Sequence, residues 1–408
     1  MAGRIPVDEH AAFVRSLLTG LGARPTERVA LADALGRITA SPVESPIALP
    51  PFRNSQMDGF AVRAADVTDA PVSLPIAAEV AAAAGAPATL APGTAVRIMT
   101  GAPVPDGADA IVPVEDTAPD GEPRDAGRGS GLGRIRILRP REAGEYVREA
   151  GSDLPAGADV LPPGLTLASR HLAAAAASGL TELLVRERVR VAIVSTGSEL
   201  VTPGAALGAG QIPDANGVAL AAAVRAVGAV VVHEGRVRDE VSRLRAELDA
   251  AHDAGAELVL TSGGVSMGAY EVVRETLEPL GGWVGSVAMQ PGGPQATGAY
   301  RGMPVIGFPG NPVSAQLSFE LFVAPTLRAI AGLPPARTER LPLAAPLTSV
   351  AGKRQFLRGR RADGGSAEVV GGPGSHLVAA LAASELLIVV PEDVTSLDAG
   401  AMVDTVFL

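Results

Sequence analysis

The pattern of apolar and polar residues along the chain is most regular between residues 187 and 334. Apolar runs of strand length, such as 189–194 and 258–261, alternate there with segments of helical period, such as 216–227 and 313–331. Strands and helices that alternate in this way predict a parallel sheet with helices on both faces. We therefore expect a central doubly wound α/β domain over residues 187–334.

The flanking regions follow other patterns. Residues 9–21 and 26–35 have helical period, and Gly36 ends the second expected helix. Residues 46–139 contain short alternating runs interrupted by Pro and Gly, which predict a β-rich domain, and residues 335–408 return to short strands typical of a small β-barrel or sandwich. The chain is thus expected to be a multi-domain α/β plus β protein.

Composition narrows the classes of function. The formal net charge is −10, which disfavours binding to a nucleic-acid backbone. We find no signal peptide and no apolar run that could span a membrane, so the protein is expected to be cytoplasmic. There is no cysteine, and the five histidines are scattered without metal-ligand spacing. We expect each histidine at the surface or as a helix cap, so any chemistry must use carboxylates, hydroxyls, arginines and backbone amides.

Four glycine-rich turns follow or flank the expected strands of the α/β region, at residues 195–199, 210–216, 261–268 and 309–314. Ligands of open α/β sheets bind beyond the carboxyl ends of the strands. Glycines let the backbone approach a ligand, and amides at helix N-termini form an anion site. A single turn of this kind is more often only structural, but four together favour a binding site. The candidate ligand-binding residues are Ser195, Thr196, Gly197, Asp214, Asn216, Ser262, Gly263, Gly264, Ser266, Pro309, Gly310, Asn311 and Ser314.

Carboxylates lie close to these turns, at Glu199, Asp214, Asp239 and Glu271. Acidic groups repel an anion unless a cation lies between them, and Mg²⁺ bound by carboxylates and phosphate oxygens is the usual one. We weigh a helix N-cap role for Asp239 equally with catalysis. Glu271 has the alternative role of complementing a helix dipole.

The segment 50–60, Pro-Pro-Phe-Arg-Asn-Ser-Gln-Met-Asp-Gly-Phe, places Asp58 on a glycine turn outside the α/β region. Taken in order, this segment, residues 98–105, the four turns, and residues 356–359 and 372–375 resemble the molybdopterin molybdenumtransferase (MoeA) family, to which the gephyrin C-terminal region also belongs. The resemblance covers almost the whole chain.

The resemblance implies a homodimer of four-domain subunits. Domain I would comprise residues 1–45 and 140–186, domain II residues 46–139, domain III residues 187–334 and domain IV residues 335–408. The implied reaction is Mg²⁺-dependent insertion of molybdate into adenylylated molybdopterin, with release of AMP. The implied protein partners are the molybdopterin adenylyltransferase and the acceptor molybdoenzymes.

The resemblance also assigns individual residues. The catalytic acids of the family fall on Asp58, Glu199, Asp239 and Glu271, and Glu199 and Asp239 are the expected metal ligands. The residues that match substrate-holding positions, besides those on the four turns, are Thr100, Asp153, Arg358 and Ser375.

The chain departs from the family pattern at one prominent place. Many relatives carry basic residues before and within a Lys/Arg-Pro-Gly-Lys motif, whereas residues 286–293 here contain no Lys or Arg. The turn at 266–271 also lacks its first acid, and Arg53 stands where an acid is frequent. Two alternatives therefore stay open: a catalytically weak paralogue that carries molybdopterin or its adenylate, and an adenylyl transferase that shares only the α/β domain. The similarity of the flanking domains argues against the second.

Overall fold

The computed structural model describes residues 4–82, 85, 87–120, 132–265 and 271–408. They form two compact units. Unit 1 comprises Met1–Glu27, Gly36–Ile38 and Arg186–Leu408, and unit 2 comprises Arg28–Leu35 and Thr39–Val185.

The centre of unit 1 is a six-stranded sheet in the order β16-β13-β17-β21-β20-β18. The neighbours from β16 to β21 are parallel, as the sequence predicts, whereas β20 pairs antiparallel with β21 and with β18. The two antiparallel strands were not predicted, because residues 294–300 mix Pro, Gly and polar residues and give no apolar run. The bounds are β13 (Arg190–Thr196), β16 (Val230–Val237), β17 (Leu258–Ser262), β18 (Trp283–Ser286), β20 (Pro294–Tyr300) and β21 (Met303–Phe308).

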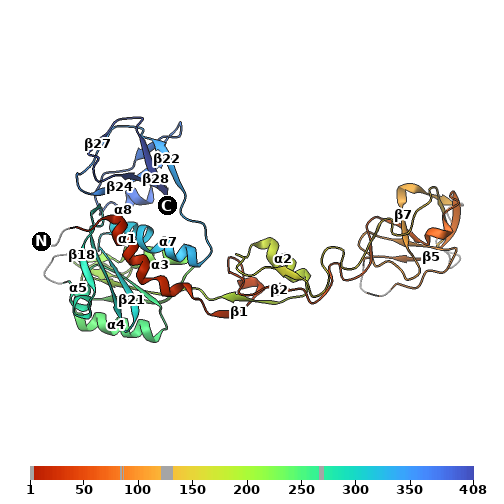
Figure 1. The fold of residues 1–408 in the computed structure, drawn as a ribbon, viewed down its shortest axis with the longest axis horizontal. Coiled ribbons are helices and arrows are strands. Elements are labelled where there is room, and N and C mark those ends of the chain that lie inside the picture. Colours follow the sequence, from red (N-terminus) through yellow and green to blue (C-terminus); the bar gives the residue numbers. More distant parts are fainter. Residues whose placement is uncertain (1–3, 83–84, 86, 121–131, 266–270) are drawn as a thin grey trace. The chain divides into compact units, whose positions relative to one another are not determined.

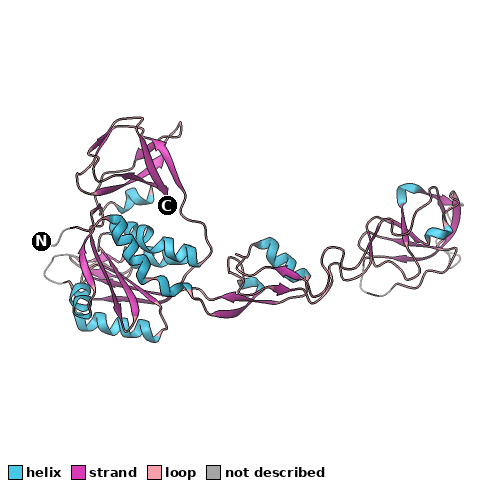
Figure 2. Cartoon of the chain, viewed as in Figure 1, coloured by secondary structure: helices cyan, strands magenta, loops and turns pink. Residues whose placement is uncertain are grey.

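Helices cover both faces of this sheet (Figures 1 and 2). Alternate residues of β13 enter different cores: Val191 and Ile193 pack with α1, α3 and α6–α7, whereas Ala192 and Val194 pack with α4 and α5. This alternation is the period of two that a strand buried on both faces requires. The helices are α1 (Val7–Leu17), α3 (Ala215–Ala226), α4 (Val241–Asp253), α5 (Val272–Leu277), α6 (Pro312–Ser318) and α7 (Ala324–Ile330), with the π-helical turn η6 (Phe319–Val323) joining the last two.

The N-terminal region differs from the expectation in two ways. α1 packs in the core of the α/β sheet, although the sequence interpretation assigns residues 1–45 to domain I. The second expected helix, residues 26–35, is wrong: Thr26–Ala30 form strand β1, which pairs with β12 (Glu182–Arg186), and only Leu31–Asp33 form a 3₁₀ turn. Side chains of β1 alternate between exposed and half-buried, and pairing with a strand about 155 residues away overrides the local helical period.

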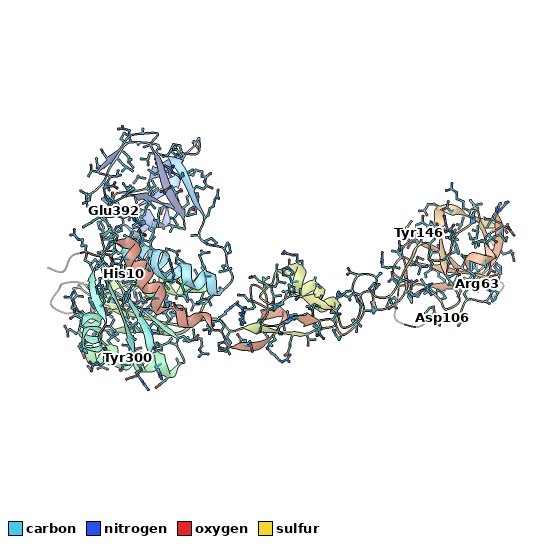
Figure 3. All side chains as sticks on the ribbon, viewed as in Figure 1. His10, Arg63, Asp106, Tyr146, Tyr300 and Glu392 are labelled. Carbon is cyan, nitrogen blue, oxygen red and sulfur yellow. The ribbon has the colours of Figure 1, made fainter. Side chains whose placement is uncertain are left out.

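His10 on α1 also corrects an expectation. It is labelled in Figure 3. Its side chain is fully buried, and its ring contacts those of Trp283 and Phe322, with centroids 5.2 and 4.6 Å away. Neither ring nitrogen has a hydrogen-bond partner, and burial lowers the pKa of His10 to about 4. The surface or capping role expected for every histidine is therefore wrong for His10. It is confirmed for His171, whose Nδ1 accepts a hydrogen bond from the Ala168 amide at 3.0 Å.

A second sheet of unit 1 has the order β19-β24-β26-β28-β22, and β25 pairs with β24. Its strand β19 comes from the segment between β18 and β20 of the α/β domain and pairs parallel with β24. The interpretation of residues 335–408 as a small β domain therefore misses one strand supplied from outside that range. The bounds are β19 (Met289–Gln290), β22 (Thr338–Pro342), β24 (Arg354–Arg361), β25 (Ala367–Val369), β26 (Leu386–Val390) and β28 (Met402–Phe407), with β23 (Leu347–Thr348), β27 (Ser396–Leu397) and α8 (Val378–Ala382) beside them.

Unit 2 contains the β-rich region that the sequence predicts. Six strands form a sheet in the order β7-β4-β6-β5-β9-β8, and alternate residues of β4 enter two different cores. A smaller core lies around α2 (Ser169–Ala177). The strands are β2 (Val43–Glu44), β3 (Asn54–Ser55), β4 (Gly59–Val62), β5 (Val72–Val80), β6 (Ala95–Ile98), β7 (Ala110–Pro113), β8 (Thr117–Asp120), β9 (Arg134–Ile137), β10 (Val147–Arg148) and β11 (Asp159–Leu161). No helix in the described part of the chain is long and apolar enough to cross a membrane.

Candidate active site

A cavity of about 690 Å³ lies in unit 1 at the carboxyl ends of β13, β17 and β21. The turns after these three strands all contribute lining residues, as expected for adjacent parallel strands. The predicted site residues that line it are Thr196, Gly197, Glu199, Asp239, Gly263, Gly264, Glu271, Pro309, Gly310, Asn311, Ser314 and Ser375. The structure therefore brings these predicted residues together at one cavity.

Glycines at two of the turns have physical reasons to be there. Gly263 has φ +88°, and a Cβ at this position would lie 2.6 Å from the carbonyl oxygen of Thr196. Gly197 has φ +153°, and its Cβ would lie 2.7 Å from a carboxylate oxygen of Glu199. Both positions exclude a side chain, so the turns pack tightly and the Glu199 carboxylate lies directly against the backbone.

Three carboxylates line the cavity, and we call Glu199, Asp239 and Glu271 the acidic group. Asp239 Oδ2 accepts a hydrogen bond from the Ser198 amide at 3.1 Å, and the Asp239 amide donates to Ser198 Oγ at 3.3 Å. Helix α4 begins at Val241 with Glu240 at the N-cap and no side-chain cap bond. The N-cap alternative for Asp239 is therefore wrong, and its carboxylate instead holds the turn that carries Glu199.

The acidic group can supply only part of the oxygen ligands that a hard cation needs, so a bound substrate must supply others. Across the described ranges, no three His, Asp or Glu side chains are close enough together to hold a metal ion unaided. Mg²⁺, however, is usually bound by one or two carboxylates together with water and substrate phosphate oxygens. Glu199 and Asp239, both anchored at the 197–199 turn, supply such a partial set of oxygen ligands.

Basic residues also line the cavity, and sequence reasoning missed them. Arg4 comes from the segment before α1, Lys353 precedes β24, and His376 follows the predicted Ser375. We call Arg4 and Lys353 the basic group. Lys353 is the only lysine in the chain, which is the one signal in the sequence that could have drawn attention to it.

The segment 286–293, which lacks Lys and Arg, lines the same cavity through Ser286 and the residues from Met289 to Gly293. Gln290 Oε1 accepts a hydrogen bond from Gln355 Nε2 at 3.3 Å. The segment in which this chain lacks the basic residues of many relatives therefore lies at the cavity itself.

Arg358 was expected at a substrate-holding position, but its side chain does not line the cavity. Its side chain is 1% exposed and donates a hydrogen bond to the Gly372 carbonyl, while its Nε has no partner. Burial lowers the pKa of the Arg358 guanidinium. The residue lies behind the 372–375 loop, whose Ser375 carbonyl accepts a hydrogen bond from the Val313 amide at 3.2 Å.

A second cavity of about 350 Å³ shares Glu199, Gly310 and Asn311 with the first. The predicted residues Asp214 and Asn216 line this second cavity. Asp214 caps α3 through the Gly217 amide at 2.9 Å, and Asn216 Nδ2 donates to the Gly310 carbonyl at 2.7 Å. Both residues therefore shape the turns, and the buried Oδ1 of Asn216 has no partner.

The remaining predicted residues within the described ranges do not line either cavity. Ser195 and Ser262 are buried, with their hydroxyl oxygens 3.5 Å apart, and Ser266 lies outside the described residues. Asp58, Thr100 and Asp153 belong to unit 2.

Within unit 2, the structure brings two of the predicted residues together. The Thr100 amide and hydroxyl both donate to Asp58 Oδ1 at 2.7 Å, and these bonds lower the pKa of Asp58. Asp153 is exposed, and its amide donates to the Leu49 carbonyl at 2.9 Å.

Comparison with known proteins finds one family along almost the whole chain. Residues 5–179 match the MoeA N-terminal region (domain I and II), residues 192–329 a probable molybdopterin binding domain, and residues 340–408 the MoeA C-terminal region (domain IV). Molybdopterin molybdenumtransferase 2 of Mycobacterium tuberculosis is 44% identical, with 97% of each chain covered. Molybdopterin molybdenumtransferase 1 of the same organism is 36% identical, covering 93% of this chain and 94% of the relative.

A solved structure extends the similarity to the fold. The crystal structure of a molybdopterin biosynthesis MoeA protein from Pyrococcus horikoshii matches with a TM-score of 0.78 and 32% identity, covering 99% of each chain. Strand-end turns around one cavity, a flanking β-rich unit and full-length similarity to these relatives lead to one conclusion: the chain belongs to the MoeA family.

Proposed function

We propose that the protein inserts molybdate into adenylylated molybdopterin and releases AMP, the last step of molybdenum cofactor biosynthesis. The observation that carries this proposal is the cavity of unit 1, where glycine-rich turns, three carboxylates and two basic side chains meet in a chain similar over its full length to molybdopterin molybdenumtransferases. Adenylylated molybdopterin and molybdate are both anions, so a site for them needs basic side chains, and it needs carboxylates to bind the Mg²⁺ that neutralises phosphate charge.

The residues divide the work by their chemistry. We assign phosphate contacts to the backbone amides at 264 and 310–311, because the amides of Gly197 and Gly263 already donate to the Val237 and Phe308 carbonyls. We assign Glu199 and Asp239 as ligands of Mg²⁺, and Glu271 as a further acid of the site. When bound there, Mg²⁺ would neutralise phosphate charge and polarise the bond to the leaving AMP. Ser314 and Ser375 offer hydroxyls to an oxyanion.

In unit 2, the pair Asp58 and Thr100 is the part that we assign to substrate handling. The two Thr100 hydrogen bonds keep Asp58 ionised and fix one of its carboxylate oxygens. Such a held carboxylate is suited to orienting a polar group of a substrate. We assign Asp58, Thr100 and Asp153 to substrate handling, and Arg358 to support of the loop that carries Ser375. We also propose a homodimer, which sedimentation equilibrium tests directly.

A second function has one observation in its favour. The cation-free segment 286–293 lines the cavity, and a weakened attraction for molybdate is what a paralogue acting as carrier of molybdopterin would show. The two functions differ in turnover: a carrier binds the adenylate and releases no AMP beyond one equivalent.

Reconstitution separates them. Adenylylated molybdopterin, molybdate, Mg²⁺ and the protein are incubated with a molybdoenzyme stripped of its cofactor, while AMP release and recovered activity are followed. The proposal predicts that both depend on molybdate and continue over many turnovers. AMP release that stops at one equivalent, or recovered activity no greater than without the protein, would reject it in favour of the carrier.

A further inference from the structure

Segment 286–293 is bordered on both sides by chain segments that carry the basic group. On one side, the Ile5 amide donates to the Ser286 carbonyl at 3.0 Å, and the Ala288 amide donates to the Ile5 carbonyl at 2.8 Å. On the other side, the Arg354 amide donates to the Ala288 carbonyl at 2.9 Å. Arg4 and Lys353 are therefore each one residue before a direct partner of the cation-free segment.

The pairing also fixes their level along the segment. Ile5 is the parallel partner of Val287, and Arg354 is the parallel partner of Met289. Because all three segments run in the same direction, Arg4 is level with Ser286 and Lys353 with Ala288. The two cations are thus within about two residues of each other in register, and both side chains line the cavity.

Two other basic side chains close to segment 286–293, Arg354 and Arg358, are paired with carboxylates or buried. Arg354 makes a bidentate contact with Asp8, at 2.8 and 3.0 Å, and a further ion pair with Glu392 at 3.1 Å. These contacts lower the pKa of Asp8, as expected for a carboxylate paired with a guanidinium. Arg358 is buried behind the loop and donates to Gly372.

Arg4 and Lys353 differ from these arginines. Among the described residues, neither side chain makes an ion pair or a hydrogen bond, although both line a cavity that also holds carboxylates. Lys353 is half-buried and Arg4 is exposed. Their charges are therefore available to a ligand, and partial burial of Lys353 strengthens its attraction for an anion relative to a fully solvated site.

We infer that Arg4 and Lys353 form an oxyanion subsite of this cavity and replace the basic residues that segment 286–293 lacks. The ligand is a tetrahedral dianion, which on the proposed function is either molybdate or the phosphate of the nucleotide. The choice of lysine suits this role, because its ammonium is a compact charge that can approach one oxygen. The inference rests on the proposed function for the identity of the anion, but not for its charge.

Direct binding tests the subsite. Titration calorimetry with sodium molybdate and, separately, with AMP compares the wild type with Lys353→Gln and Arg4→Gln at two ionic strengths. We expect each substitution to weaken at least one of the two anions about tenfold, with a smaller salt dependence. Weaker molybdate binding assigns the subsite to molybdate, and weaker AMP binding assigns it to the nucleotide phosphate.

Two further variants make the result specific. Arg340→Gln removes one exposed cation from β22 of the same unit, outside the cavity lining, and should leave both affinities unchanged. Lys353→Gln combined with Gln290→Lys moves the charge to another lining residue and should restore the lost affinity.

Equal affinities for both anions in the wild type, Lys353→Gln and Arg4→Gln, including no measurable binding in any of them, would overturn the subsite. This outcome is distinct from failure of the proposed function, because the binding measurement needs no turnover. A wild type that inserts molybdate while Lys353→Gln and Arg4→Gln keep full anion affinity contradicts only the subsite. A wild type that binds the anion through Lys353 but releases no AMP contradicts only the function.

Discussion

The acidic and basic groups of the cavity are built in different ways. The acidic group sits on turns directly after strands or at the start of helices of one α/β domain. The Ser198 amide holds the Asp239 carboxylate, and the Glu199 carboxylate lies against the backbone at Gly197. The basic group comes from the chain's N-terminal segment and from the residue before β24, which are joined through segment 286–290 and through the contact of Arg354 with Asp8.

This difference has a functional consequence. Carboxylates fixed by the backbone form a rigid site suited to a metal ion, which requires defined geometry. Long basic side chains without fixed partners adapt to an oxyanion and contribute mainly through charge, so their effect depends on salt. The two groups should therefore act on different ligands.

The largest effect is expected at Asp239. Asp239→Asn removes the negative charge and keeps the size of the side chain, so insertion should fall at least about 100-fold, as for loss of a catalytic electrostatic group. Thermal unfolding should change little, because Asp239 does not cap α4. Glu240→Gln, at the adjacent N-cap position, is the matched control and should retain activity. A fully active Asp239→Asn variant would remove the acidic group from the reaction.

The second prediction concerns how the N-terminal segment is held. His10 is buried and neutral, with a folded pKa of about 4 against an ordinary value of 6.5. The unfolded chain therefore takes up a proton that the folded chain refuses, and stability falls as the pH drops from 6.5 towards 4. Between pH 7 and 5 this costs about 2 kcal/mol of unfolding free energy.

Chemical denaturation at several pH values measures this loss, and His10→Leu should largely abolish it. The half-buried Glu320 acts in the opposite sense, because desolvation raises its pKa and its protonation in the folded state favours the fold as the pH falls. It is unchanged in the variant, so the difference between wild type and His10→Leu isolates the histidine. Asp8, whose pKa is lowered by Arg354, stabilises the fold above its ordinary pKa of 3.8 and loses this contribution only as the pH falls below that value, outside this interval. Identical pH profiles in the two proteins would show that the His10 imidazole is not buried in solution.

The same contrast explains what could be predicted from the sequence. The strands, the turns after them and the lining residues Thr196, Gly263 and Asn311 follow from local patterns, because a strand and its turn are contiguous. Resemblance to the family added Ser375, which no local pattern marks.

Long-range pairing accounts for what was missed. Strands β19 and β1 depend on partners far away in the chain, and so does the presence of Arg4 and Lys353 at one cavity. The antiparallel strands β18 and β20 pair with near neighbours and were missed because residues 294–300 contain no apolar run. A helical period at 26–35 was outweighed by pairing with β12. Asp239 illustrates the intermediate case: the position was found, but only the structure shows that the helix begins two residues later and leaves its carboxylate to the turn.

The third prediction restores charge to segment 286–293. Gln290→Lys with Gly293→Lys should lower the molybdate concentration that gives half-maximal insertion about tenfold and make it more sensitive to salt. Gln290→Leu loses the same contact with Gln355 but adds no charge, and should give no such gain. A Cβ at Gly293 would lie 3.3 Å from Ser286 Oγ, so the single Gln290→Lys variant is the cleaner test of charge alone. An unchanged half-saturation point in both lysine variants would mean that the segment does not act on molybdate.

The most direct test of two separate charged groups is insertion rate measured while Mg²⁺ and molybdate are varied independently, in the wild type, Asp239→Asn and Lys353→Gln. With molybdate as the anion of the basic group, Asp239→Asn should raise the Mg²⁺ requirement of its residual insertion without changing the half-saturating molybdate concentration. Lys353→Gln should raise that molybdate concentration about tenfold and leave the Mg²⁺ requirement as in the wild type. Two variants that shift both requirements together, or a Lys353→Gln variant that shifts only the Mg²⁺ requirement, would contradict the separation of the two groups.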